Sequence, residues 1–368
     1  MTGARLGIDR VIAGDCADLI PDQARLGLLS NRAAFASDGR LTRDGVASAF
    51  GLAPSDGPGL ARLFSPEHGW DATHEAGLAA PDGRDDITGL SVHSLYGPRA
   101  TPNRRALADL DAVIVDLPDV GVRCYTYAAT AAMFSATALE AGLKVVVCDR
   151  PNPLGPRTAG PRPGTGLRGL LAYFDVPFVH GLRLGGLLAS EGLVANPQLA
   201  VIDCLEDGPP DPAIDWHPPS PSLTCHEAVT FYPGLVLLEG TNVSEGRGTD
   251  MPFRCVLAPW LDPGPLVELV SDKPELGAAA REITATPDAG KFAGSPCRGI
   301  ALTPLPGAPV LGFELGVNLL AGLARMPAFE WTRSGGNYFV DRLLGGGALR
   351  HAVDTGVPAE EILAAFED

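Results

Sequence analysis

Short apolar runs alternate with helix-like stretches over the first two thirds of the chain. The clearest run is Ala112–Leu117, whose β-branched residues lie between Asp111 and Pro118 and predict a buried strand. Four more runs predict strands: Leu26–Ser30, Leu60–Phe64, Lys144–Cys148 and Leu199–Cys204. Helices are predicted between the strands, at Thr42–Phe50, Thr126–Ala141 and Leu184–Leu193. This alternation indicates a parallel sheet with right-handed crossovers, and therefore a Rossmann-like α/β domain.

The pattern changes at the proline-rich stretch from Gly208 to Thr224, which cannot form a helix interior or a central strand. We place a domain boundary near residue 228. The Rossmann-like domain then covers residues 1–228, and a smaller C-terminal α+β domain covers residues 229–368. In the second domain the pattern predicts helices at Leu266–Val270, Leu315–Arg325 and Ala359–Phe366, and strands at Arg298–Leu302 and Val310–Phe313.

Composition and charge narrow the classes of function. Hydrophobic residues make up 45% of the chain and charged residues 20%, as in ordinary globular proteins, which excludes global disorder. The formal net charge of −16 disfavours binding to nucleic acid, because the protein repels phosphates. The N-terminus lacks the apolar segment of a signal peptide, and no apolar stretch is long enough to span a bilayer. We therefore expect a cytoplasmic protein without a membrane span.

Several common enzyme motifs are missing or out of context. The seven cysteines include no Cys-x-x-Cys pair, which disfavours zinc ribbons and thioredoxin-like motifs. The run Gly164–Gly169 matches G-x-G-x-x-G, but it follows prolines instead of a strand and so predicts a loop rather than a dinucleotide site. His74 and His226 each precede a glutamate, but neither has the second histidine of a zinc-protease motif.

Polar side chains follow four of the predicted strands, at the edge where open parallel sheets bind ligands. Asn31 follows the first strand, and Glu67 and His68 follow the second. The next two strands are followed by a larger polar set: Asp116, Arg123, Tyr125, Tyr127, Arg150 and Asn152. Each residue alone could equally cap a helix or form a loop ion pair. Together they predict a cleft for a polar, hydroxylated small molecule.

A second polar run, Glu239–Thr249, lies in the predicted C-terminal domain. It combines three glycines with Glu239, Asn242, Glu245 and Arg247, and so supplies many hydrogen-bond donors and acceptors in a loop. We expect this loop to line the cleft, and a surface turn is the alternative.

Six motifs occur in an order that identifies a family: Pro66–Gly69, Asp119–Tyr127, Asp149–Pro153, His180-Gly181, Pro218–Pro221 and Glu239–Thr249. From about Gly7 to Phe366 the chain resembles the NamZ (YbbC-like) exo-β-N-acetylmuramidases of peptidoglycan recycling. The resemblance implies a Rossmann-like domain and a smaller C-terminal domain with the active cleft between them. It also implies release of N-acetylmuramic acid from the non-reducing end of peptidoglycan fragments, without a metal or an organic cofactor.

The resemblance marks Glu67 as the leading catalytic candidate. Glycoside hydrolysis needs a proton donor to the leaving oxygen, a role we assign to Glu67, with His68 as a residue that orients it or tunes its pKa. The second catalytic group stays open: Asp116, Glu239 and Glu245 are candidates, and the acetamido group of the substrate is the alternative. Arg123, Arg150 and Arg247 are candidates for binding the lactyl carboxylate of N-acetylmuramic acid.

The expected partner is a small carbohydrate, a muropeptide or an N-acetylmuramic acid–N-acetylglucosamine fragment. Two other functions stay open from the sequence: a non-catalytic sugar-binding protein, and a hydrolase of a different amino-sugar glycoside on the same fold.

Overall fold

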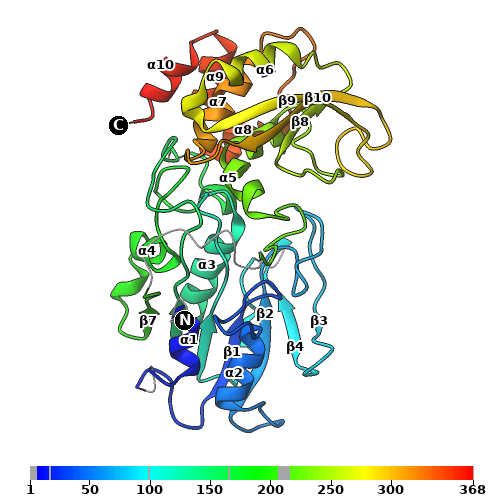
Figure 1. Ribbon diagram of the computed structural model, residues 1–368. Helices are drawn as coiled ribbons and strands as arrows, with labels where there is room; N and C mark the ends of the chain where they lie inside the picture. The colour runs from blue at the N-terminus through cyan, green and yellow to red at the C-terminus, as the bar shows by residue number, and fades with distance from the viewer. Residues whose placement is uncertain (1–5, 16–17, 98–99, 165, 206–215, 368) are drawn as a thin grey trace. The chain divides into compact units, whose positions relative to one another are not determined.

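The computed structural model describes residues 6–15, 18–97, 100–164, 166–205 and 216–367 (Figure 1). The contacts within the chain define two compact units. The first unit comprises residues 1–121, 125–156 and 181–221, and the second comprises residues 122–124, 157–180 and 222–368. Two short segments that precede residue 222 therefore belong to the C-terminal unit. The boundary near residue 228, as a limit between folding domains, stays a prediction.

A seven-stranded sheet forms the centre of the first unit, in the order β3-β4-β2-β1-β5-β6-β7. Its strands are β1 (Arg25–Leu29), β2 (Gly59–Ser65), β3 (Gly83–Arg84), β4 (Ser91–Ser94), β5 (Ala112–Val115), β6 (Lys144–Cys148) and β7 (Leu199–Ile202). Every neighbouring pair is parallel except β3 with β4. Because β2 and β5 lie on opposite sides of β1, the strand order reverses there. Ligands of open α/β sheets bind at such a switch point.

Helices cover both faces of this sheet (Figure 1). On one face α1 (Gly7–Ile12) and α2 (Thr42–Phe50) contribute Ile8 and Val46 to a core that includes Leu28 of β1. Successive strand residues point to opposite faces, and Phe64 of β2 contacts α3 (Thr126–Glu140) on the other face, at a ring-centroid distance of 4.8 Å from Phe134. The short helix α4 (Leu184–Ser190) packs against α3 and β6. The expected Rossmann-like α/β architecture is confirmed.

The second unit is a smaller α+β structure, as expected. Its main sheet is antiparallel, in the order β8-β10-β9, and consists of β8 (Cys255–Ala258), β9 (Ala278–Ala285) and β10 (Cys297–Pro304). A two-residue ladder joins β11 (Arg333–Ser334) to β12 (Asn337–Tyr338). The helices are α5 (His226–Leu235), α6 (Gly264–Ser271), α7 (Gly312–Leu323), α8 (Phe339–Leu344), α9 (Ala348–Asp354) and α10 (Ala359–Ala364).

The strand expected at Val310–Phe313 is wrong, because α7 begins at Gly312. Val310 and Leu311 directly precede this helix, and Phe313, which is 1% exposed, lies in its first turn. Glycine explains the close packing here. A Cβ added at Gly234 of α5 would lie 2.1 Å from the carbonyl oxygen of Gly312 and 2.8 Å from the amide nitrogen of Gly316. The two helices approach closely because neither carries a side chain at this crossing.

We predict that Gly234→Ala destabilises the protein. The added methyl group overlaps backbone atoms that cannot rotate away, so the free energy of unfolding should fall by about 1–3 kcal/mol. Chemical denaturation measures this change. The matched control is Gly186→Ala in α4, where the nearest heavy atom would be the Leu182 Cβ at 3.4 Å. Alanine favours a helix over glycine, so the control should be neutral or slightly stabilising. Equal losses in the two variants would contradict the packing argument.

Candidate functional site

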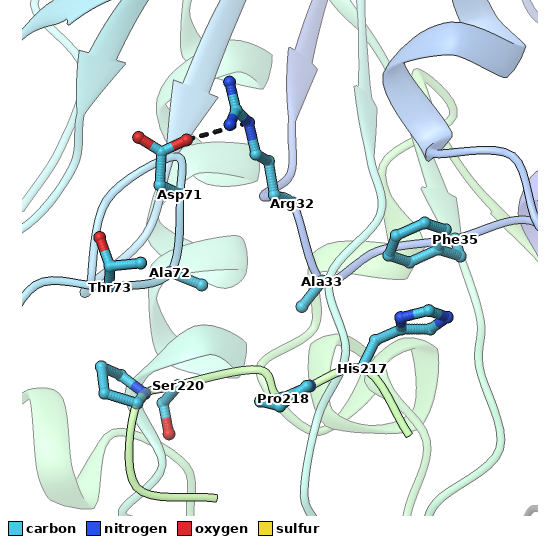
Figure 2. Close-up of a pocket in the computed structure, with 10 residues that line it drawn as sticks. Arg32, Ala33, Phe35, Asp71, Ala72, Thr73, His217, Pro218 and Ser220 are labelled. Carbon is cyan, nitrogen blue, oxygen red and sulfur yellow. Dashed lines mark ion pairs between the residues drawn. The ribbon is translucent and has the colours of Figure 1, made fainter. Parts of the chain in front are cut away.

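The loops after β1 and β2 line a pocket of about 400 Å³ together with residues 217–221 of the proline-rich segment (Figure 2). Its lining residues are Arg32, Ala33, Phe35, Asp71, Ala72, Thr73, His217, Pro218, Ser220 and Pro221. The backbone amide of Arg32 donates to the carbonyl oxygen of Trp70, which joins the first two loops. The Phe35 ring stacks on His217 with a centroid distance of 3.7 Å. The pocket therefore lies at the carboxyl ends of the strands, but none of the site residues predicted from the sequence is among its lining residues.

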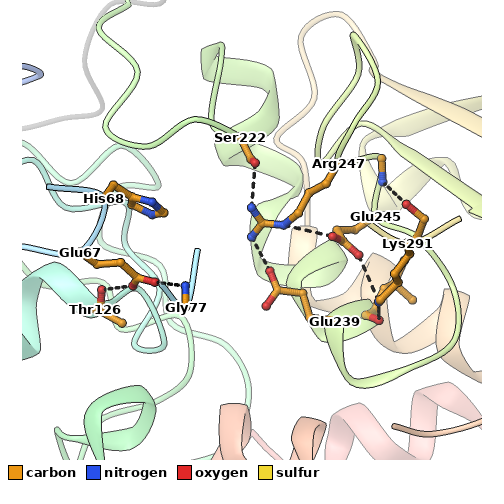
Figure 3. A network of polar contacts seen from close by, with 12 residues as sticks. Glu67, His68, Gly77, Thr126, Ser222, Glu239, Glu245, Arg247 and Lys291 are labelled. Carbon is orange, nitrogen blue, oxygen red and sulfur yellow. Dashed lines mark hydrogen bonds and ion pairs between the residues drawn. The ribbon is translucent and has the colours of Figure 1, made fainter. Parts of the chain in front are cut away.

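Glu67 lies in a tight turn directly after β2. The turn is closed by a hydrogen bond from the Gly69 amide to the Pro66 carbonyl, and both His68 and Gly69 have positive φ, at 68° and 74°. Glu67 is 7% exposed, and each oxygen of its carboxylate accepts a hydrogen bond (Figure 3). Its Oε1 accepts from the Gly77 amide at 2.7 Å, and its Oε2 accepts from the Thr126 hydroxyl at 2.6 Å. The side chain is therefore held in one position at the sheet edge.

His68 is oriented by the same loop. Its Nδ1 lies 2.6 Å from the carbonyl oxygen of His74. A carbonyl oxygen only accepts hydrogen bonds, so Nδ1 carries a proton. A non-glycine residue in the left-handed region is uncommon and is held there by its surroundings. The turn therefore fixes the direction of the imidazole.

Three further expected residues gather beside this loop. The Asn31 side chain donates to the Tyr127 hydroxyl at 3.0 Å and accepts from the Ala33 amide. Tyr127 donates in turn to the Pro219 carbonyl, and burial raises the pKa of its phenol. The ring centroids of Tyr125 and Tyr127 lie 4.6 Å apart. Asn31, Tyr125 and Tyr127 thus connect the first strand loop, α3 and the proline-rich segment.

Asp116 and Arg150 form a buried ion pair with two parallel hydrogen bonds. Arg150 Nε and Nη2 each lie 2.7 Å from a different oxygen of Asp116, whose side chain is fully buried. The Thr42 hydroxyl also donates to Asp116, at 2.5 Å. Burial disfavours the charged guanidinium, but the adjacent Asp116 carboxylate more than offsets this and raises the pKa of Arg150. These contacts make Asp116 a brace for the sheet edge and leave it poorly suited to activate water.

Asn152 also serves the local backbone. Its amide donates to the Leu182 carbonyl at 3.0 Å, and its oxygen accepts from the Leu154 amide at 2.9 Å. The side chain thereby shapes the turn after β6.

Arg123 belongs to the second unit, where backbone oxygens surround its guanidinium. Nη1 donates to the carbonyls of Pro161 and Val176 at 2.9 and 2.7 Å, and Nη2 donates to the carbonyl of Leu344 at 2.6 Å. The residue is 2% exposed, and burial lowers the pKa of Arg123 to about 10. Arg123 therefore fastens three backbone segments of the second unit together.

The Glu239–Thr249 loop carries a cluster of charged groups (Figure 3). Arg247 Nη2 donates to Glu239 at 2.6 Å, and its Nε lies 3.1 Å from Glu245. The Ser222 hydroxyl accepts a further bond from Arg247, and Lys291 contacts Glu245 at 3.3 Å. Burial raises the pKa of Glu239, and the Glu245 carboxylate adds to that rise while Arg247 opposes it.

Asn242, in the same loop, bonds to backbone. Its amide donates to the Ala328 carbonyl at 2.7 Å, and its oxygen accepts from the Glu330 amide at 3.0 Å. The residue ties the loop to the segment before β11.

Sequence reasoning missed several contacts of these residues. Gly77 acts through its backbone amide, which no side-chain pattern reveals. Lys291 lies between glycine and an aromatic residue in a long loop, without a motif. Arg32 carried a usable signal, because it directly follows Asn31 at the end of β1 and enters the pocket.

The described residues form neither a metal-binding cluster nor a membrane-spanning helix. No group of three or more His, Cys, Asp or Glu side chains in that part of the chain is placed to hold a metal ion. None of its helices combines the length and the apolar character needed to cross a membrane.

The fold and the site define an α/β protein with a buried, doubly hydrogen-bonded glutamate at the carboxyl edge of a parallel sheet. Two family models match the chain: the N-terminal domain of the exo-β-N-acetylmuramidase NamZ over residues 26–227, and its C-terminal domain over residues 230–368. The chain therefore belongs to the NamZ family, and the resemblance seen in the sequence motifs is confirmed.

Individual relatives agree with this assignment. The peptidoglycan β-N-acetylmuramidase NamZ of Bacillus subtilis (strain 168) is 30% identical over 317 residues, which are 84% of this chain and 76% of that protein. Two crystal structures of DUF1343 family proteins from Bacteroides fragilis share the fold. One has a TM-score of 0.83 at 22% identity and covers 98% of this chain and 94% of that one. The other has a TM-score of 0.71 at 23% identity and covers 100% and 95%.

We predict that Arg123→Ala lowers stability severely, because it leaves three buried carbonyl oxygens without their donor. The free energy of unfolding should fall by about 3 kcal/mol or more, as measured by urea denaturation. The control is Arg254→Ala in the same unit, which removes a partly exposed ion pair with Glu227 at 3.0 Å. That change should cost about 1 kcal/mol or less. A stable Arg123→Ala protein would show that the guanidinium is not needed as a brace.

Proposed function

We propose that this chain is an exo-β-N-acetylmuramidase, which removes a terminal β-linked N-acetylmuramic acid from the non-reducing end of peptidoglycan fragments. The proposal is supported by the family membership and by the name of the Bacillus subtilis relative. The observation that carries it is the fixed carboxyl group of Glu67. A glycosidase needs such a group to protonate the leaving oxygen, and its position must hold to within a fraction of an ångström.

Glu67 acts as the general acid in this mechanism, and His68 is a positioning residue. The acid donates its proton to the glycosidic oxygen as the bond to the anomeric carbon breaks and positive charge develops on the sugar ring. His68 supports the turn through its hydrogen bond to the His74 carbonyl, so it influences the acid indirectly.

Glu239 is the best of the three candidates for the second carboxylate. Asp116 is occupied by Arg150, and Glu245 is held by both Arg247 and Lys291. Glu239 has a 22% exposed side chain and shares Arg247 with Glu245. The acetamido group of the substrate remains the alternative nucleophile.

The substrate is a muropeptide or an N-acetylmuramic acid–N-acetylglucosamine fragment, and the reaction belongs to peptidoglycan turnover and recycling. No metal or organic cofactor takes part. A cytoplasmic location stays a prediction.

Glu67→Gln should lower kcat by about 10²–10⁴-fold on a disaccharide of N-acetylmuramic acid and N-acetylglucosamine, because glutamine keeps the shape but cannot donate the proton. Release of N-acetylmuramic acid is the measurement. Glu75→Gln is the control, since Glu75 lies exposed in the same loop, and its activity should match that of the wild type. Near-normal turnover by Glu67→Gln would refute its role. Binding without turnover by the wild type would indicate a sugar-binding protein.

His68→Ala should have a milder effect that differs in kind. A positioning residue changes the environment of the acid, and the acid is inactive once it has lost its proton, so the alkaline limb of the kcat/KM pH profile should move while substantial turnover remains. The pH profiles of the wild type and the variant test this. A variant as inactive as Glu67→Gln, with an unshifted profile, would make His68 part of the proton transfer itself.

A further inference from the structure

The proposed substrate poses an electrostatic problem. N-acetylmuramic acid differs from N-acetylglucosamine by a lactyl ether that ends in a carboxylate. A protein with a formal net charge of −16 repels this anion at long range, so recognition requires a cation at the site. The inference below rests on the proposed function and concerns which cation this is.

The three arginines that the sequence suggested are each engaged elsewhere. Arg123 donates to three backbone carbonyls and is 2% exposed. Arg150 is held by both oxygens of Asp116, which is fully buried. Arg247 is shared between two glutamates and the Ser222 hydroxyl. At Arg150 and Arg247 a ligand carboxylate would have to displace a buried carboxylate of the protein. At Arg123 it would have to displace backbone carbonyl oxygens.

Arg32 is placed differently. It lines the pocket at the sheet edge, and its side chain is 35% exposed (Figure 2). Its Nε pairs with Asp71 at 2.9 Å, and Asp71 is itself 49% exposed. Asp85 and Asp86 lie farther from the guanidinium, at 3.7 and 3.8 Å. An ion pair this exposed contributes little, because water screens both partners. Asp71 can therefore give way to a ligand carboxylate at small cost.

The loop that carries Glu67 also forms part of the wall of the pocket that Arg32 lines. The loop is closed by hydrogen bonds from the Gly77 amide to Glu67 and from the His74 amide to the His68 carbonyl. Asp71, Ala72 and Thr73 lie between these closing contacts and line the pocket. The loop that positions Glu67 thus also supplies three residues of the pocket wall.

The other walls suit a carbohydrate. Phe35 stacked on His217 provides an aromatic surface, and Thr73 and Ser220 provide hydroxyl groups. The volume of about 400 Å³ lies in the usual range of small-molecule pockets. Arg150 also reaches this region, because it donates to the Phe35 carbonyl and so anchors the loop.

We propose that Arg32 binds the lactyl carboxylate of N-acetylmuramic acid, replacing its contact with Asp71, and thereby determines the preference for this sugar over N-acetylglucosamine. The guanidinium forms two parallel hydrogen bonds with the carboxylate oxygens.

The test compares kcat/KM for the 4-nitrophenyl β-glycosides of N-acetylmuramic acid and N-acetylglucosamine. Arg32→Gln should lose roughly 10–100-fold on the muramic acid glycoside, mainly in KM, and little on the glucosamine glycoside. Asp71→Asn should keep or increase activity on the muramic acid glycoside, by roughly 2–5-fold, because it removes the competing anion. Arg40→Gln is the control, since it breaks a similarly exposed pair with Asp38 outside the pocket.

The direction of these changes separates recognition from structure. If the Arg32–Asp71 pair only supports the loop, both substitutions should lower activity on both sugars to the same extent, and the proposal is wrong. It also fails if Arg32→Gln keeps the wild-type preference between the sugars. If the wild type hydrolyses neither glycoside, the proposed function fails. Calorimetric titration with N-acetylmuramic acid then tests the role of Arg32 independently. Binding that Arg32→Gln abolishes supports this role. If the wild type does not bind the sugar, or Arg32→Gln binds it equally well, the role is overturned.

Discussion

The buried ion pair between Asp116 and Arg150 is the interaction on which the candidate site depends. It joins the end of β5 to the end of β6, and through Thr42 and the Phe35 carbonyl it also holds the start of α2 and the loop after β1. Removing two charges from water costs several kcal/mol per ion. The attraction between them offsets this cost only when their geometry is favourable and nearly all their hydrogen bonds are formed. Here both carboxylate oxygens and the guanidinium edge are engaged. Such a pair tolerates little displacement, so the loops that it anchors start from fixed positions.

The architecture of the first unit could be predicted from the sequence because its strands are buried on both faces. Runs such as Ala112–Val115 then become continuously apolar, and their ends locate the sheet edge. The second unit followed these rules less closely. β9 reads Ala-Ala-Ala-Arg-Glu-Ile-Thr-Ala, residues that favour a helix by propensity, yet pairing with β10 along its whole length makes it a strand. The start of α7 was misjudged for a related reason, because close packing at Gly234 and Gly316 is a tertiary effect.

The residues of the candidate site were easier to predict than their roles. Asn31, Glu67, His68 and Tyr127 could be named because they follow strand ends, and the structure gathers them within one unit. The role of an arginine depends on its hydrogen-bond partner, and the sequence does not show which group that partner is. Arg123 lies in the Asp119–Tyr127 motif, but its partners are carbonyls from segments far along the chain, including Leu344. A guanidinium pairs equally well with carbonyl, carboxylate or ligand oxygens, so residue type alone leaves the choice undetermined.

Burial and the partners of the guanidinium distinguish Arg123 and Arg150, which hold the protein together, from Arg32, which is available to a ligand in the pocket. A deeply buried guanidinium cannot lose its partner without leaving an uncompensated charge, which makes its contacts effectively permanent. A half-exposed guanidinium such as that of Arg32 exchanges one oxygen partner for another with water as intermediary, so its ion pair is reversible. An acidic protein that recognises an anionic sugar needs both kinds. The permanent ion pairs hold the loops in place. The reversible pair keeps the Arg32 guanidinium in the pocket, where Asp71 weakens the attraction of Arg32 for other anions until a carboxylate of the right geometry binds.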